Sequence, residues 1–369
     1  MEPRFFEPDE GVVPIGTETA TSGLCQETHF YYCASAKAVD ISQQTVHCKA
    51  VLPNHSGEEA DLSFALEYDA LVLATGAVGS TFGIPGVHEY AHFLREVSDA
   101  EHIRNNIIAN LARCNLPGIS PEERSRLLHF VIVGGGPTGV EFTGELTDFI
   151  IQDVARLFPG AAAEMKITLV EARDVLGSFE AAHRDYATTR LEKKGVHFQK
   201  ATVKEVHAAH LETDNGNIPY GVLVWSTGVG PTPFVTALPL DHAAGRIAVD
   251  ACLRARLADD PSKHLPNVFA AGDCSANVDA PLPALAQVAE QQGAYLAQCL
   301  NANAGKPSSD PPAFQYRHMG SMVSLGTGSA VIEIFGKGLT GWTAWFGWRT
   351  LPLTDPVTSV ENETKQNQG

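Results

Sequence analysis

Short apolar runs that end in a glycine-containing turn are the most regular feature of the chain. They occupy Tyr68–Ala74, His129–Val133, Gly221–Ser226 and Asn267–Ala271. Runs of this length without polar alternation predict strands covered on both faces, as in a parallel sheet between helices. Lys166–Val170 predicts a further strand of the same kind.

Helical periodicity lies between these strands. Apolar residues recur at helical spacing in Ser98–Arg113, for which Ser98 is the expected N-cap. A second helix is expected to run to about Phe158, and a third covers Ala284–Leu300. Because buried strands alternate with helices, the chain is predicted to have an α/β fold.

Less regular segments lie toward both ends of the chain. Short strands are expected at Thr28–Ala34, Thr45–Leu52, Met322–Leu325 and Ala330–Phe335. The polar tail after Pro352 is expected to be disordered.

Composition narrows the class of protein. The length of 369 residues suits two or three domains, with expected boundaries in the polar stretches Pro117–Arg126 and Pro239–Gly245. A formal net charge of −17 argues against nucleic acid as a partner, because phosphates would be repelled. The 7 cysteines include no Cys-x-x-Cys pair, which suits a reducing compartment and argues against a zinc site. The 14 histidines show no metal-binding spacing, so no metal is predicted.

A Gly-x-Gly-x-x-Gly motif follows the strand at His129–Val133 and opens a helix. The first glycine permits a tight turn, the second lets the backbone approach a pyrophosphate, and the third lets helix and strand pack closely. Phosphates would then lie on the exposed N–H groups of the helix N-terminus. The predicted dinucleotide-binding residues are Gly134, Gly135, Gly136, Pro137, Thr138 and Gly139.

Two acidic residues accompany this motif. Glu171 ends the next strand, where a carboxylate would accept hydrogen bonds from the ribose hydroxyls. It would also repel a 2′-phosphate and so favours NADH over NADPH, although Arg173 nearby would partly tolerate that phosphate. Glu141, in the first turn of the helix, is either an acid matched to the helix dipole or a contact to the nicotinamide end of the ligand.

Several blocks of the sequence together resemble the type II (alternative, non-proton-pumping) NADH dehydrogenases, in particular their plant and algal forms. The blocks are LVLATGA, FGIPGV, FVIVGGGPTGVEFTGEL, VWSTGVG, LPNVFAAGDC and ALAQVAEQQGAYLA. The likeness covers roughly Phe5 to Leu351. Many flavin reductases share the Thr-Gly and Gly-Asp elements, whereas the pairing of AQVAEQQG with WSTGVG is much narrower.

The resemblance implies two nested, three-layer Rossmann-like domains, with an FAD domain split around an inserted NADH domain. It places the first FAD segment at 1–120, the NADH domain at 121–240, the second FAD segment at 241–325, and a membrane-docking segment with its tail at 326–369. The FAD-binding positions that it implies are Ala74, Thr75, Gly76, Gly272 and Asp273. The corresponding strand end of the NADH domain carries Thr227 and Gly228.

The implied activity is that of an NADH:quinone oxidoreductase. It passes a hydride from NADH to FAD and two electrons to a membrane quinone, without pumping protons. The catalytic candidates are Glu141, Gln287 and Gln291, and the two glutamines share one helical face that borders the flavin and quinone in the family.

The resemblance also implies a peripheral position on the mitochondrial inner membrane, and a homodimer is a further expectation. Trp342, Trp345 and Trp348 are spaced by three residues, so on a helix they would form one face suited to the lipid interface. Packing of these rings in a core is the alternative.

The sequence departs from the family at both ends. The first Gly-x-Gly-x-x-Gly, which holds the FAD pyrophosphate, has no counterpart before Ala74, and the docking helices have none after Leu351. We therefore expect a truncated FAD domain and weak FAD binding by this chain alone. The alternatives are an NADH-binding pseudoenzyme or fragment without FAD, or a reductase of ferredoxin or thioredoxin. The missing Cys-x-x-Cys pair opposes the thioredoxin type, and AQVAEQQG opposes the ferredoxin type.

Overall fold

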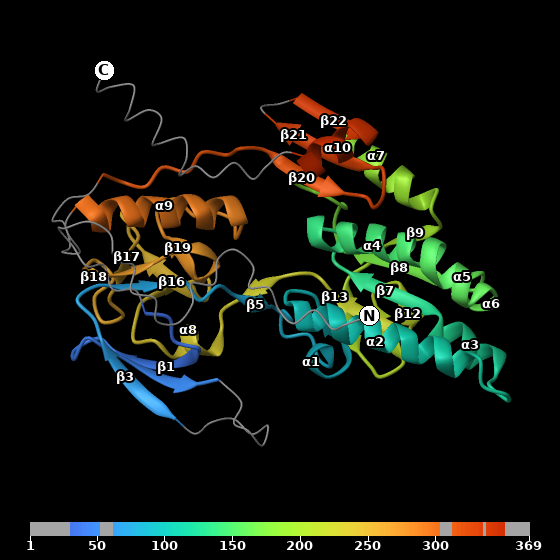
Figure 1. Ribbon diagram of the computed structural model, residues 1–369, viewed down its shortest axis with the longest axis horizontal. Helices are drawn as coiled ribbons and strands as arrows, with labels where there is room; N and C mark the ends of the chain where they lie inside the picture. The colour runs from blue at the N-terminus through green and yellow to red at the C-terminus, as the bar shows by residue number, and fades with distance from the viewer. Residues whose placement is uncertain (1–29, 52–61, 303–311, 335–336, 351–369) are drawn as a thin grey trace.

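The structure, a computed structural model, describes residues 30–51, 62–302, 312–334 and 337–350. Two larger sheets lie side by side, each with its own helices and smaller sheets (Figure 1). One of the two sheets combines a strand that precedes the other sheet in the sequence with strands that follow it. Leu71–Leu73 pairs there with His264–Ala270. The predicted α/β class and the nested arrangement of two dinucleotide-type domains are confirmed. The predicted tail after Pro352 lies outside the described residues.

The five-stranded sheet carries the glycine motif, and we call it the nicotinamide-side sheet after the ligand expected there from the sequence. It is parallel at every pairing. Its order is β6 (His92–Phe93), β13 (Val222–Trp225), β7 (His129–Val133), β8 (Lys166–Glu171) and β9 (Val196–Lys200). Val131, Ile132 and Leu169 are completely buried, because helices or further strands cover both faces of the sheet. The continuous apolar runs of the sequence therefore became inner strands, as predicted.

The helices of this region are α1 (Val87–Tyr90), α2 (Val97–Cys114), α3 (Pro121–Leu127), α4 (Pro137–Phe149), α5 (Ala155–Leu157), α6 (Pro159–Ala162) and α7 (Ala181–Glu192). A π-helical turn, η1 (Ile150–Val154), continues α4 into α5, so the helix predicted to reach Phe158 is confirmed. A small antiparallel sheet consists of β10 (Val203–Val206), β11 (His210–Thr213) and β12 (Gly216–Pro219). It packs on one face of the five-stranded sheet, because its buried residues share a core with Val131 and Leu223.

Helix α2 corrects two expectations. Its N-cap is Glu96 instead of Ser98, because the Asp99 carboxylate accepts a hydrogen bond from the Glu96 N–H at 2.9 Å. The apolar face of α2, with Ile103 and Ile107, packs in the same core as the strand residue Phe130. Helix α2 and strand β6 therefore belong to the nicotinamide-side sheet, although the sequence placed them in the first FAD segment at 1–120.

The six-stranded sheet is mixed, and we call it the flavin-side sheet after the ligand expected there from the resemblance. Its order is β15 (His242–Ala243), β16 (Arg246–Val249), β17 (Arg254–Arg256), β18 (His264–Ala270) and β4 (Leu71–Leu73), with β19 (Ser275–Asn277) beside β16. Helix α9 (Ala286–Ala302) covers one face, and α8 (Pro233–Ala237) lies on the other side (Figure 1). Strand β4 is last in the order among the described residues, and Val72 is 40 % exposed there. The expectation that this strand is fully buried is wrong for Val72.

An antiparallel sheet of β1 (Ala34–Asp40), β2 (Thr45–Ala50) and β3 (Ser63–Glu67) stands beside the flavin-side sheet. Strand β1 begins at the residue where the predicted strand Thr28–Ala34 ends, whereas β2 lies where it was predicted. A two-stranded ribbon of β5 (Val78–Gly79) and β14 (Val229–Gly230) forms where the chain crosses between the two larger sheets.

The C-terminal sheet, of β20 (Ser321–Ser324), β21 (Ala330–Ile334) and β22 (Lys337–Gly341), carries helix α10 (Trp342–Thr350). It packs against α4 and α7 of the nicotinamide side. Lys194 donates to the Asp148 carboxylate at 2.6 Å and to the Leu325 carbonyl at 3.1 Å, and the Thr327 N–H donates to Asp148. Across the described residues, none of the helices combines the length and apolar character needed to cross a bilayer.

Replacing Lys194 with Met is expected to lower the free energy of unfolding by about 3 kcal/mol, because Asp148 would stay partly buried without its cation. The matched control is Lys200→Met, which breaks an exposed pair with Asp174 and should cost less than about 1 kcal/mol. Urea unfolding of both variants measures the difference. Equal losses would contradict the role assigned to the Lys194–Asp148 pair.

Candidate functional site

The glycine turn between β7 and α4 has the geometry that the motif predicts. Gly134 has a φ of +114°, which side chains rarely allow. A Cβ at Gly139 would lie 1.9 Å from the Gly134 carbonyl oxygen, so only glycine lets the helix approach the strand this closely. Gly136 faces open space, with nothing within 4 Å of a Cβ built on it. The turn therefore combines tight packing on one side with an open approach on the other.

A cavity of about 540 Å³ opens in front of this turn. Gly135, Gly136 and Pro137 line one side, and Glu171 and Thr227 line others. No side chain caps the N-terminus of α4, so its first N–H groups are available to an anion. The cavity is therefore suited to the pyrophosphate and ribose of a dinucleotide.

The Glu171 carboxylate lies beside the glycine turn, where the sequence predicted it. One oxygen accepts a hydrogen bond from the Gly135 N–H at 2.7 Å, and the other accepts from the Arg173 N–H at 2.9 Å. These bonds fix the side chain at the wall of the cavity. A second cavity of about 410 Å³ adjoins it and is lined by Arg173, Arg184 and Asp174 as well as Glu171.

Thr227 and Gly228 follow strand β13 and meet the glycine turn from its other side. A Cβ at Gly134 would lie 2.9 Å from the Thr227 Cβ. Gly228 has a φ of +77° and leaves room for the ring of Phe82, which reaches over from the segment after β5. The structure therefore brings the two predicted strand ends together, as expected for neighbouring parallel strands.

A separate cavity of about 570 Å³ lies at the ends of β4 and β18. The predicted residues Ala74, Gly76, Gly272 and Asp273 line it. The facing side of α9 contributes small residues, and Gly293 there has open space around its Cβ position. This wall leaves room for an extended or flat ligand at the carboxyl ends of two parallel strands, which is where α/β sheets bind ligands.

Two polar contacts at this cavity were not found from the sequence. The Asp273 carboxylate pairs with the Arg95 guanidinium at 2.6 Å, and this joins the flavin side to the nicotinamide side. The Gly272 N–H donates to the Gln292 side chain at 2.7 Å. The sequence could have indicated the contact of Gln292, because this residue lies between Val288 and Leu296 on the buried face of α9. A polar side chain on such a face needs a hydrogen-bond partner.

Gln287 and Gln291 share one face of α9, as predicted, but both amides are bonded to the segment before β20. Gln287 donates to the Gly320 carbonyl at 2.8 Å. Gln291 donates to the Arg317 carbonyl at 2.8 Å and accepts from the N–H of the same residue at 2.9 Å. The contacts present are therefore structural, and they fix residues 316–320 against α9.

Glu141 is turned toward the C-terminal sheet. Its carboxylate accepts a hydrogen bond from the Ser324 N–H at 3.1 Å. Burial raises the pKa of this carboxyl group above its usual value, and the bond from Ser324 only partly offsets that effect. Neither of the two roles weighed from the sequence anticipated this contact with β20.

Together, the glycine turn, the acid at the end of β8 and two cavities at strand ends define a dinucleotide-binding oxidoreductase fold with two nucleotide sites. Residues 7–293 match the family model of the pyridine nucleotide-disulphide oxidoreductases. The chain is 42 % identical over 352 residues to a mitochondrial internal alternative NAD(P)H-ubiquinone oxidoreductase A1 of Solanum tuberosum, with 90 % of this chain and 70 % of the relative covered.

An Arabidopsis thaliana protein of the same name is 43 % identical, with 89 % of this chain and 67 % of the relative covered. Among solved structures, NDH2 from Plasmodium falciparum in complex with NADH aligns with a TM-score of 0.74 at 22 % identity, covering 87 % of this chain and 80 % of that one. The chain belongs to the pyridine nucleotide-disulphide oxidoreductase family and, within it, to the group of the alternative NAD(P)H-ubiquinone oxidoreductases.

Replacing Glu171 with Gln is expected to shift the ratio of NADPH to NADH dissociation constants in favour of NADPH. The loss of one negative charge beside the ribose should be worth more than about 1 kcal/mol to a 2′-phosphate, and tenfold in affinity corresponds to about 1.4 kcal/mol. Titration of both nucleotides into both proteins measures the ratio. A ratio that stays within about twofold would mean that Glu171 does not select the nucleotide.

Proposed function

We propose that the chain is an NADH:quinone oxidoreductase that uses FAD and transfers electrons to a membrane quinone without pumping protons. The observation that carries the proposal is the presence of two cavities at strand ends, one on each sheet, in a chain that spans most of the relatives named as NAD(P)H-ubiquinone oxidoreductases. When bound, FAD supplies the chemistry, because it accepts a hydride and releases electrons singly or in pairs. The chain's own residues bind, orient and separate the substrates.

The nicotinamide nucleotide is assigned to the cavity at the glycine turn. The N–H groups at the start of α4 hold its pyrophosphate, and Glu171 accepts hydrogen bonds from the ribose of the adenosine half. Thr227 lines the cavity on the side of the crossing ribbon, and Gly228 connects it to β14 of that ribbon. The ligand would therefore extend across the carboxyl ends of β7 and β13.

FAD is assigned to the cavity between β4, β18 and α9. Small residues such as Ala74, Gly76 and Gly293 leave room for it, and Asp273 lies at its edge. Gln287 and Gln291 hold residues 316–320 against α9, and we assign the quinone to this side of the helix. Glu141 is assigned a positioning role instead of the catalytic one, because its carboxylate holds the Ser324 N–H of β20.

Filling this cavity should weaken FAD binding without unfolding the protein. Gly293→Leu places a side chain in open space inside the cavity, so the FAD dissociation constant should rise at least tenfold. Gly160→Leu is the matched control, since Gly160 also has open space around it but lies on the exposed surface near α5. Absorbance in the flavin band during FAD titration gives the constants, and NADH-dependent quinone reduction gives the activity.

The same titration separates the enzyme from an NADH-binding pseudoenzyme. NADH binding together with no saturable FAD binding by the parent chain would reject the oxidoreductase and favour the pseudoenzyme. FAD binding that Gly293→Leu leaves unchanged would reject only the assigned cavity.

The membrane contact is proposed at α10, with the mitochondrial inner membrane as the proposed site. The relatives named as mitochondrial support the choice of organelle. Trp342 and Phe346 are exposed and stack with ring centroids 5.6 Å apart. Trp345, which the sequence placed on the same face, packs partly against the core of the C-terminal sheet and lies beneath the Arg349 guanidinium. The Trp348 side chain lies outside the described residues. We therefore propose that Trp342 and Phe346 enter the lipid interface; the homodimer stays a prediction.

Replacing Trp342 and Phe346 together with Ser is expected to abolish co-sedimentation with liposomes, because the exposed aromatic surface of α10 is removed. NADH binding should be unchanged, since neither residue lines the cavity at the glycine turn. The control replaces the exposed rings of Phe30 and Tyr31 with Ser. If the parent protein does not sediment with liposomes, or the control loses as much, α10 is not the membrane contact.

A further inference from the structure

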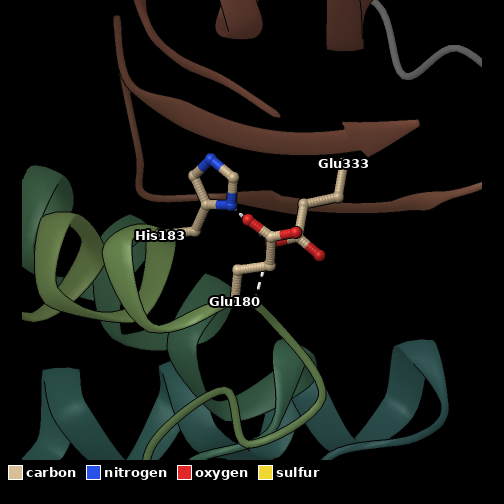
Figure 2. Close-up of side chains that lie close together, drawn as sticks. All are labelled: Glu180, His183 and Glu333. Atoms are coloured by element: carbon tan, nitrogen blue, oxygen red, sulfur yellow. Dashed lines mark hydrogen bonds and ion pairs between the residues drawn. The ribbon is translucent and has the colours of Figure 1, made fainter. Parts of the chain in front are cut away.

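We propose that Glu180, His183 and Glu333 bind a divalent transition-metal ion of the Zn²⁺ type between helix α7 and strand β21. The proposal does not depend on the function proposed above. Figure 2 shows the imidazole of His183 and the two carboxylates converging on one point from two elements. One ligand atom from each of the three side chains lies within 4.8 Å of the other two. In a tetrahedral zinc site with bonds of about 2.1 Å, ligand atoms stand roughly 3.4 Å apart, so rotamer adjustments suffice to close the site.

The ligand types and their spacing suit such an ion. Zn²⁺ and its neighbours in the first row accept imidazole nitrogen and carboxylate oxygen together. Glu180 is the N-cap of α7 with an extended backbone, and His183 is the third residue of the helix, so the two side chains meet beside its first turn. Glu333 supplies the third ligand from β21, which lies 150 residues away from His183 in the sequence.

The charges around the cluster favour a divalent cation over a simple ion pair. Glu333 contacts His183 Nδ1 and accepts from the Glu180 N–H at 2.8 Å. The Glu180 carboxylate has no hydrogen-bond or ion-pair partner among the described residues, and no Lys or Arg of that part of the chain pairs with either carboxylate. A protonated His183 supplies one positive charge for two carboxylates, whereas a divalent ion offsets both.

The two inner ligands are held in place by packing. The side chains of His183 and Glu333 are only 12 % and 18 % exposed. A Cβ at Gly338 would lie 1.9 Å from the ring of His183, so glycine on β22 makes room for the imidazole. One turn further along α7, the Tyr186 hydroxyl bonds with the Ser329 hydroxyl at 3.1 Å. Because α7 and the C-terminal sheet are joined on this face, the ligands meet without ordering a loose segment.

A second cluster serves as an internal comparison. Glu205, His207 and Glu212 also meet within 4.8 Å, on the hairpin of β10 and β11. Here all three side chains are at least 36 % exposed, and the ring of His207 stacks on that of His210 with centroids 4.5 Å apart. Water competes more strongly for these ligands, and they lie within one small sheet. We therefore assign the ion to the cluster around His183 alone.

The test titrates Zn²⁺ into the full chain after removal of metals with EDTA, using a competing chelator to define affinity. We expect one ion per chain to be bound at this cluster. Glu333→Gln and Glu180→Gln should each weaken that binding at least tenfold, and His207→Gln should leave it unchanged. The cysteine thiols are the same in all variants, so any zinc that they bind cancels in the comparison.

Two further readouts distinguish ligation from a structural role. Zn²⁺ should raise the unfolding temperature of the parent and of His207→Gln, but not that of Glu180→Gln. Co²⁺, used as a probe, should give visible bands that His183→Gln alters. Glu180 is exposed, so Glu180→Gln decides the matter even if the His183 or Glu333 variants do not fold. Equal zinc affinity of the parent and Glu180→Gln, or a loss confined to His207→Gln, would overturn the proposal.

Discussion

The close contact between α4 and β7 is the constraint on which the rest of the structure depends. It exists because Gly139 has no side chain that could collide with the Gly134 carbonyl oxygen. The same contact aims the N-terminus of α4 at the nucleotide cavity. Further along the helix, Gly144 lets the backbone of Leu325 approach, and Asp148 receives Thr327 and Lys194. One helix thus sets both the glycine-turn cavity at its start and the position of the C-terminal sheet along its length.

Much of the fold follows from local patterns in the sequence. The apolar runs at β7, β8 and β13 predicted inner parallel strands, because only a strand covered on both faces can be apolar throughout. The glycine motif predicted the turn between β7 and α4, because Gly134 adopts a positive φ and Gly139 leaves no room for a side chain. The position of α2 was not predictable in this way. The apolar periodicity of α2 predicts a helix. Packing between segments that are distant in the sequence decides which sheet its isoleucines cover.

The polar residues also divide into those whose contacts follow from nearby sequence and those whose contacts depend on distant segments. The position of Glu171 beside the glycine turn could be expected, because its partners are Gly135 of the motif and Arg173, two residues further along the chain. The partners of Gln287, Gln291 and Glu141 are backbone groups of residues that join them only in the folded chain. Asp273 likewise meets Arg95, 178 residues away in the sequence. Helical spacing in the sequence predicts which side chains share a face. It does not predict hydrogen-bond partners that come from a distant part of the chain.

The crossing between the two sheets ties their sites to each other. Strands β5 and β14 pair there. Trp225 ends β13, and its indole N–H donates to the Ser80 carbonyl at 2.9 Å. On the other side of the crossing, Arg95 holds Asp273 at the edge of the flavin-side cavity. These polar contacts link the strand ends at the two cavities to each other through the crossing. Transfer of a hydride between two bound nucleotides demands such fixed alignment, since small displacements of the reacting atoms are costly. The crossing therefore contributes to the site by fixing the position of the residues that line the two cavities.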